Sequence, residues 1–191
     1  MRVVAGTARG MRLKVPPGHK MRPTSDMVRE AIFDILADKP AGARVLDLFA
    51  GTGALGIEAL SRGAAHATLV ERSDRCLRII RENLAHTRLG EQARLIPGDV
   101  YPEVRKLAET GERFDLVLAD PPYAGHGRDR PGPAPAQKAL QLIAATAILP
   151  KSGVVVIEHA SGVALPDQAG GLALWKTRRY GSTSVSVYRC T

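Results

Sequence analysis

The feature that most constrains the fold is a regular alternation of short apolar segments with amphipathic segments from residue 44 onward. Apolar runs predict strands at residues 44–48, 67–70, 93–96, 114–119 and 154–157. Apolar residues at helical spacing predict helices at residues 54–62, 74–87, 101–109 and 137–148. Two further strands, 172–176 and 184–188, are close enough in sequence to pair antiparallel. Repeated β-α-β units with apolar strands predict an α/β fold, with a mostly parallel sheet covered by helices on both faces.

The segment that precedes this alternation is the most basic part of the chain. Residues 1–24 hold six Lys or Arg and no acid, within a chain of 191 residues whose net charge is +8. Two short runs, 2–5 and 11–15, flank a turn and predict a β-hairpin of alternating basic and apolar residues. We therefore expect a single domain over 1–191, made of a hairpin extension over 1–23, a lead-in helix over 24–38 and a core over 43–191.

The charge of the hairpin favours a polyanionic partner, with RNA or DNA the first choice. A basic surface without a particular partner explains the charge about equally well. On the first interpretation, RNA contacts come from the hairpin side chains Arg9, Arg12 and Lys14. The core is then expected to fold without the hairpin. In the alternative, four apolar residues of the hairpin close the core: Val3, Val4, Leu13 and Val15.

Composition excludes several classes of protein. Hydrophobic residues make up 45% and charged residues 24%, which is ordinary for a globular domain and rules out a disordered or collagen-like chain. The two cysteines, Cys76 and Cys190, have neither disulfide-framework nor metal-ligand spacing, so no metal site is expected. No segment has the length and hydropathy of a membrane span, and the first residues do not resemble a signal peptide. We therefore expect a cytoplasmic protein that does not contact a membrane.

A glycine-containing turn joins the first predicted strand to its helix, in the sequence Asp47-Leu-Phe49-Ala-Gly51-Thr-Gly53-Ala-Leu-Gly56. Its three glycines formally match the dinucleotide fingerprint, because they let the backbone approach a ligand closely. The acid Asp47 distinguishes this turn, since a carboxylate there repels a pyrophosphate and suits a ligand that bears an ammonium and a sulfonium. S-adenosyl-L-methionine is such a ligand. The alternative is a tight strand-helix turn in which Asp47 caps the helix.

Two more acids follow the second and third predicted strands. Glu71 comes 20 residues after Gly51, where a carboxylate can accept hydrogen bonds from both ribose hydroxyls of a nucleoside. Asp99 can accept from an adenine amine, while the backbone at Val100 meets the edge of the ring. Taken alone, Glu71 is more often a solvated surface acid and Asp99 part of an ordinary turn. Ligands bind at the carboxyl ends of parallel strands, so we expect these residues to share one site.

The most specific motif is Asp120-Pro121-Pro122-Tyr123, which follows the fourth predicted strand. Two prolines fix the backbone and remove two N–H donors, so the loop offers only acceptors, namely the Asp120 carboxylate and the Pro121 carbonyl. This acceptor pair suits an exocyclic amine, whose nitrogen lone pair it turns toward an electrophilic methyl group. Tyr123 supplies a flat face on which an extruded base can stack. The alternative is a proline-rich turn under the sheet.

Together these residues resemble the class I S-adenosylmethionine-dependent methyltransferases that act on exocyclic amines. A narrower resemblance is to the small bacterial 16S ribosomal RNA guanine-N2 methyltransferases. It rests on three further segments: Arg2-Val-Val-Ala-Gly6, Arg22-Pro-Thr-Ser-Asp-Met-Val-Arg-Glu-Ala-Ile-Phe33 and Tyr180-Gly-Ser-Thr183. The match runs along nearly the whole chain, although a loop rich in Pro and Arg at residues 125–136 fits less well.

The resemblance implies a seven-stranded Rossmann-like sheet whose last strand runs antiparallel. It implies that S-adenosyl-L-methionine is bound by residues at three strand ends: Asp47, Phe49, Gly51, Gly53, Glu71, Asp99 and Val100. It implies that the target base is held by Asp120, Pro121 and Tyr123. Arg22 and Thr24 are expected at the mouth of the site, on an RNA phosphate or the cofactor carboxylate, although Thr24 is equally explained as a helix N-cap.

The reaction that the resemblance implies is N2-methylation of a guanine in 16S ribosomal RNA, with guanine 966 as the expected target. The partner is therefore ribosomal RNA, either naked or within an assembled small-subunit particle, and the enzyme is expected to be a monomer.

Three other functions remain open from the sequence alone. A nicotinamide-dependent oxidoreductase would use the glycine-containing turn, but it leaves Asp47 and the Asp-Pro-Pro-Tyr motif unexplained. A non-catalytic RNA-binding assembly factor fits the basic hairpin, but it has no need of an acid at four strand ends. A methyltransferase for another amine, such as DNA adenine N6 or a different ribosomal RNA base, shares the Asp-Pro-Pro-Tyr motif. The chain is short for the target-recognition region expected of a DNA enzyme.

Overall fold

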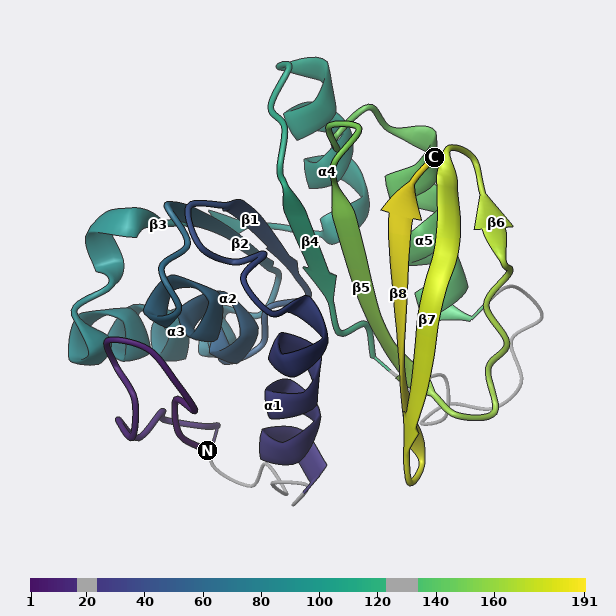
Figure 1. Ribbon diagram of the computed structural model, residues 1–191. Helices are drawn as coiled ribbons and strands as arrows, with labels where there is room; N and C mark the ends of the chain where they lie inside the picture. Colours follow the sequence, from purple (N-terminus) through teal and green to yellow (C-terminus); the bar gives the residue numbers. More distant parts are fainter. Residues whose placement is uncertain (17–23, 123–133) are drawn as a thin grey trace.

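The computed structural model describes residues 1–16, 24–122 and 134–191, and these form one eight-stranded sheet with helices on both faces (Figure 1). The strand order is β3-β2-β1-β4-β5-β8-β7-β6. The strands are β1 (Arg44–Leu48), β2 (His66–Glu71), β3 (Ala93–Pro97), β4 (Leu116–Ala119), β5 (Val154–Ala160), β6 (Gln168–Ala169), β7 (Leu172–Tyr180) and β8 (Thr183–Cys190). The helices are α1 (Thr24–Leu36), α2 (Ala54–Ser61), α3 (Asp74–Thr87), α4 (Val100–Glu109) and α5 (Pro135–Ala145), with a short 3-10 helix, η1 (Gly90–Gln92).

This topology confirms the expected α/β class with a Rossmann-like, mostly parallel sheet. Strands β1 to β5 run parallel, and β8 runs antiparallel to both of its neighbours, β5 and β7. The strand order reverses between β1 and β4, which opens a crevice at the carboxyl ends of the strands. The sheet has one strand more than expected, because the two-residue β6 adds to the edge of β7 and is too short to leave a sequence pattern.

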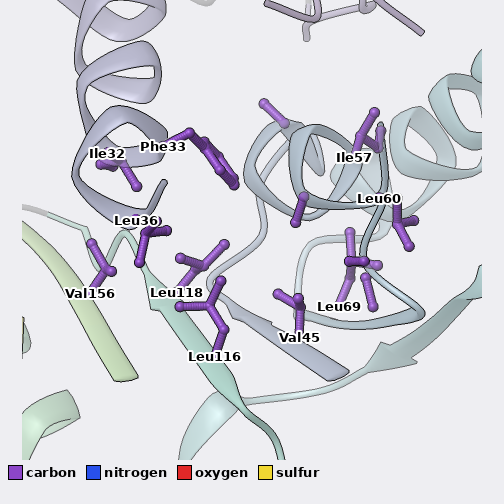
Figure 2. Packing of buried hydrophobic residues seen from close by; sticks show 14 of the residues in the cluster. Ile32, Phe33, Leu36, Val45, Ile57, Leu60, Leu69, Leu116, Leu118 and Val156 are labelled. Atoms are coloured by element: carbon purple, nitrogen blue, oxygen red, sulfur yellow. The ribbon is translucent and has the colours of Figure 1, made fainter. Parts of the chain in front are cut away.

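Two hydrophobic layers bury the two faces of the sheet. Helices α1, α2 and α3 cover one face, where Ile32, Phe33 and Leu36 of α1 lie against Leu116 and Leu118 of β4 (Figure 2). Helices α4 and α5 cover the other face and pack on the alternate residues of the same strands. Because the inner strands are buried on both sides, they are apolar at nearly every position, as the sequence pattern indicated.

Helix boundaries differ from the predicted ones where a local conformation overrides the pattern. Helix α1 ends two residues before the predicted end at residue 38, because Ala37 adopts a positive φ of 50°. Helix α5 begins at Pro135, inside the predicted loop, because proline suits the first helical turn and the Gln137 side chain accepts the Ala134 N–H at 2.9 Å. It ends at Ala145 because Thr146 is extended. Residues 125–133 of that loop lie outside the described residues. None of the described helices is long and apolar enough to cross a membrane.

The amino-terminal hairpin is reduced to a single antiparallel bridge between Arg2 and Arg12. It packs on α2 and α3, with Val3, Ala8 and Leu13 buried in the same core as α1. Backbone groups of the hairpin also bond to three buried polar side chains: Glu58, Ser61 and Asn83. The segment is therefore built into the domain rather than attached as an arm, and these contacts favour the alternative in which its apolar residues close the core.

Candidate functional site

A cavity of about 470 Å³ lies at the carboxyl ends of β1, β2, β3 and β4. Six residues that the sequence singled out line it together: Phe49, Gly51, Glu71, Asp99, Val100 and Asp120. They come from four separate strand ends, so only the parallel sheet brings them together. The remaining lining comes from residues that the sequence analysis did not assign to the site: Val70, Arg72, Ser73, Gly98, Tyr101, Pro122, Pro135 and Lys138.

Glu71 at the end of β2 organises the floor of the cavity. Its carboxylate is 8% exposed and accepts two backbone hydrogen bonds, from Gly51 N–H and from Ser73 N–H, each at 2.8 Å. Each carboxylate oxygen retains a second lone pair, so two hydroxyl donors of a ligand can still bind there. Glu71 therefore both holds the turn after β1 in place and presents acceptors to the cavity.

The turn after β1 places an aromatic side chain beside the cavity. Phe49 and Gly51 both adopt left-handed backbone conformations, with φ of 60° and 57°. For a non-glycine residue this conformation costs about 1–2 kcal/mol. The Phe49 ring meets Tyr101 edge to face, with centroids 6.3 Å apart. The two rings give the cavity an apolar wall suited to a flat heterocycle.

Asp99 at the end of β3 is the N-cap of α4. Its Oδ1 accepts the Tyr101 N–H at 2.9 Å, and its Oδ2 lies 4.0 Å from the Arg72 guanidinium. Val100 is 3% exposed and belongs to the core as well as to the cavity wall. Burial, and secondarily the charge of Asp99, raise the pKa of the Tyr101 hydroxyl. The hydroxyl therefore stays protonated and can donate.

Asp47 and Gly53 do not line the cavity. The Asp47 carboxylate is 1% exposed and accepts the Gly56 N–H at 2.9 Å, in the first turn of α2. Burial, with a smaller contribution from the charge of Glu71, raises the pKa of Asp47 to about 7, although the Gly56 hydrogen bond lowers it. This hydrogen bond to the first turn of α2 agrees with the alternative in which Asp47 caps the helix. Gly53 has φ of 77°, a left-handed conformation that favours glycine, and a Cβ there would lie 3.2 Å from the Leu69 side chain.

Asp120 brings the fourth strand end to the cavity. Its backbone N–H donates to the Leu48 carbonyl at 3.3 Å, which fixes the end of β4 beside β1. Pro122 lines the cavity, whereas Pro121 is buried and does not. Lys138, on the first turn of α5, is the one lysine or arginine besides Arg72 in the described lining. The predicted base-stacking residue, Tyr123, lies outside the described residues.

The predicted RNA-binding residues are not brought to this cavity. Arg9, Arg12 and Lys14 are exposed on the hairpin, and the Lys14 ammonium pairs with Glu82 at 2.9 Å. Arg22 lies outside the described residues, and Thr24 is the first residue of α1, with a side chain that the structure does not describe. Within the described ranges no three His, Cys, Asp or Glu side chains are grouped to hold a metal ion.

The sheet order, the crevice at its switch point and the acids at four strand ends define the class I methyltransferase fold. The chain belongs to the family described as "Conserved hypothetical protein 95", whose model matches residues 1–189. The chain is 35% identical to YlbH of Bacillus subtilis, named as a candidate rRNA methyltransferase, over 99% of this chain and 98% of YlbH.

Two further matches come from Escherichia coli. "Ribosomal RNA small subunit methyltransferase D" of strain K12 is 42% identical over 123 residues, which cover 64% of this chain and 60% of that protein. The solved structure of yhhF, described as a candidate methyltransferase, has a TM-score of 0.81 at 32% identity and covers 100% of this chain and 97% of that one. These matches confirm the family and fold expected from the sequence, and they support S-adenosyl-L-methionine as the cofactor.

Proposed function

We propose that this protein uses S-adenosyl-L-methionine to methylate the exocyclic N2 amine of a guanine in 16S ribosomal RNA, with guanine 966 as the target. The observation that carries the proposal is that Asp120 lines the same cavity as Glu71 and Asp99. One cavity can therefore hold both the target amine, at Asp120, and the cofactor, at Glu71 and Asp99. The named relative in Escherichia coli, a small-subunit ribosomal RNA methyltransferase, supports this class of substrate.

The residues of the cavity fit the cofactor. Its volume of about 470 Å³ is within the range of small-molecule sites, and its acids suit a ligand with ribose hydroxyls and an amine. Glu71 is assigned to the ribose, Asp99 with Val100 to the adenine edge, and the Phe49–Tyr101 pair to the adenine face. Bound there, S-adenosyl-L-methionine supplies an electrophilic methyl group on a sulfonium. Asp47 and Gly53 do not line the cavity, and their proposed role is to hold the conformation of the turn between β1 and α2.

Asp120 is assigned to the target amine. Its carboxylate and the Pro121 carbonyl accept the two N–H bonds of the amine, which orients the nitrogen lone pair away from the ring. The nitrogen gains positive charge as the methyl group is transferred, so the negative charge of Asp120 stabilises the transition state more than the ground state. Tyr123 is assigned to stacking on the extruded guanine. The hairpin cations and Arg22 are assigned to RNA phosphates. We expect the enzyme to act on this RNA in the cytoplasm as a monomer.

Asp120→Ala tests this assignment directly. Loss of one preorganised charge partner typically costs about 10²–10³ in rate, so methyl transfer should fall by that factor while S-adenosyl-L-methionine affinity stays within a few-fold in calorimetry. The matched control is Asp34→Ala, because Asp34 is exposed on α1 and does not line the cavity. Near-normal turnover by the Asp120 variant would refute the mechanism.

The substrate is tested in ribosomal RNA from a strain that lacks the protein. Mass spectrometry should find one missing N2-methylguanosine, and adding purified enzyme with S-adenosyl-L-methionine should restore it. Deproteinised RNA and small-subunit particles are tested side by side. An unchanged methylation pattern in the strain would contradict the proposed target, and restoration of a different modified base would replace it.

A further inference from the structure

A second surface with the chemistry of a nucleic-acid site lies away from the cavity, around Trp175 on β7. Trp175 is the only tryptophan of the chain and is 42% exposed. It sits at a β-bulge, where the pairing of β7 with β8 shifts between Leu174 and Lys176. The bulge turns the indole outward next to two cations. The Arg189 guanidinium lies 3.6 Å from the ring centroid, and the Lys176 ammonium lies 4.6 Å from it.

These residues occupy a part of the sheet that no described helix covers. Lys176 and Arg178 pair in register with Val187 and Val185, two valines that belong to the core layer on the α1 side. Helix α1 covers that face only as far as β5, whereas α5 lies behind β7 and β8 on the opposite face (Figure 1). A sheet of this class normally has helices on both faces. The β8 valines on the α1 side are buried, so the surface left open to a partner is the α1 side of β7, where Trp175 and Arg178 are exposed.

A groove of about 520 Å³ runs between this surface and the end of α1. Ile35 and Val154 give it an apolar floor, and Trp175 and Arg189 form one wall. Two cations line it, Lys39 and Arg189, and two more, Lys176 and Arg178, follow Trp175 along β7. One acid lines it, Asp38, and a second, Glu158, pairs in register with Val185 of β8, which itself pairs with Arg178. Across residues 1–16, 24–122 and 134–191, none of Lys176, Arg178 and Arg189 is within 4.0 Å of a carboxylate oxygen. The surface therefore carries a net positive charge that the described fold does not neutralise.

We propose that this surface, Trp175 with Lys176, Arg178 and Arg189, binds a single-stranded segment of the RNA substrate that flanks the target nucleotide. Cations held over an aromatic ring, with no carboxylate partner among the described residues, are a combination that holds single-stranded nucleic acid, through phosphate contacts and stacking. The Arg189 guanidinium stacked on the indole keeps its edge N–H donors free for phosphate oxygens. The proposal rests on the proposed function, because it assigns a binding surface to the same RNA.

The direction of β7 connects this surface to the reaction site. Strands β5 and β7 are both antiparallel to β8, so they run in the same direction, as does β4. Their carboxyl ends lie at one edge of the sheet, where Asp120 follows β4. From Trp175 to Tyr180 the strand advances about 17 Å toward that edge. An RNA strand laid along β7 therefore leads from Trp175 toward the edge that holds the catalytic cavity.

Because Trp175 is the sole tryptophan, its fluorescence reports on this surface alone. We expect titration of the whole protein with a single-stranded oligouridylate to change that fluorescence to saturation. Substitution of Lys176 and Arg189 by Ala removes two phosphate contacts, so the slope of log affinity against log salt should become shallower by about 1.4, at about 0.7 for each contact. The double variant should also have a raised KM for ribosomal RNA with kcat and S-adenosyl-L-methionine affinity unchanged. Trp175→Phe should retain most of the RNA affinity, whereas Trp175→Ala should lose about tenfold.

The matched control is Arg105→Ala, which removes an exposed cation from α4 on the opposite face of the sheet and should leave the salt slope within about 0.2 of wild type. A double variant with wild-type affinity, salt slope and KM overturns the inference and leaves the proposed function standing. A fluorescence change with small-subunit particles but none with deproteinised RNA assigns the surface to a protein partner and also overturns it. Saturable RNA binding that depends on Lys176 and Arg189, without methyl transfer by the wild type, upholds the inference and refutes the proposed function.

Discussion

Glu58 offers a sharp test of how the amino-terminal hairpin is held. Its side chain is fully buried on α2, and its carboxylate accepts the N–H groups of Val4 at 2.7 Å and of Ala5 at 3.0 Å. It also accepts from Arg62 at 2.8 Å and lies 3.6 Å from the buried Arg29 guanidinium. One carboxylate thus joins the hairpin, α1 and α2. The informative perturbation is Glu58→Gln, which keeps the shape and removes the charge.

The expected loss follows from the contacts. An amide offers one acceptor oxygen, so one of the two hairpin N–H groups loses its partner and faces an NH2 donor instead. Arg29, 3% exposed, loses its buried counter-charge, and among the described residues Asp26 is then its one acidic partner. Removal of one partner of a buried ion pair typically costs about 3–5 kcal/mol. For a domain of this size, each kcal/mol lowers the Tm by about 2–4 °C, so the Tm should fall by roughly 6–20 °C.

The assay is urea unfolding at neutral pH, with hydrogen exchange at the Val4 and Ala5 amides as the local readout. Both amides should lose protection more than the strands of the sheet do, because the hairpin loosens first. The matched control is Glu109→Gln, since Glu109 is exposed at the end of α4 and its loss should change stability by less than about 0.5 kcal/mol. If Glu58→Gln unfolds within 1 kcal/mol of wild type, as judged against the typical 3–5 kcal/mol cost, this account of the hairpin is wrong.

Three further outcomes are expected. Glu71→Ala should weaken S-adenosyl-L-methionine binding roughly ten- to a hundredfold in calorimetry, because charge-assisted hydrogen bonds contribute about 1.5–3 kcal/mol; unchanged affinity would remove Glu71 from the site. Asp47 has a folded-state pKa of about 7 against an ordinary 3.8, so the native state binds more protons between those values and this residue makes stability fall as pH rises across them. Asp47→Asn should flatten that fall by up to roughly 4 kcal/mol, and parallel stability curves for the two proteins would contradict the raised pKa. Gly6→Ala puts a Cβ 1.7 Å from the Ser61 carbonyl oxygen at φ of 83°, whereas Gly10→Ala at φ of 82° meets nothing within 4 Å. The Gly10 variant should lose only the about 1–2 kcal/mol of left-handed strain and the Gly6 variant clearly more in urea unfolding, so equal losses would argue against the docked hairpin.

The sequence was informative where a residue's role depends on its place along a strand. Glu71, Asp99 and Asp120 each directly follow or end an apolar strand, and strand order alone brings them to one cavity. The alternation of apolar strands and helices was therefore enough to predict the fold and the grouping of these three acids around one cavity.

Contacts between distant, ordinary-looking residues could not be predicted. From the sequence, Glu58 would be expected to be a solvent-exposed helix residue. It is buried because the hairpin packs over it. Tyr101 meets Phe49 across two different strand ends, and Lys138 reaches the cavity from a helix after a low-complexity loop. Asp47 was predicted to face the ligand, but its carboxylate instead accepts a hydrogen bond from the Gly56 N–H at the start of α2. The polar run Thr177 to Tyr180 belongs to β7 but lies beyond the predicted strand 172–176. It was missed because most of its residues are exposed and leave no apolar pattern.

The placement of β8 has a consequence for how the chain is made. Residues 183–190 form an interior strand, between β5 and β7, although both neighbours precede it in the sequence. During synthesis β5 and β7 emerge first, each with a row of unpaired backbone groups that attracts other chains. These two strand edges become protected only when β8 inserts between them. Synthesis of β8 is thus the step that converts an aggregation-prone intermediate into the complete sheet. A ribosome that stalls before β8 is made leaves β5 and β7 without the strand that joins them.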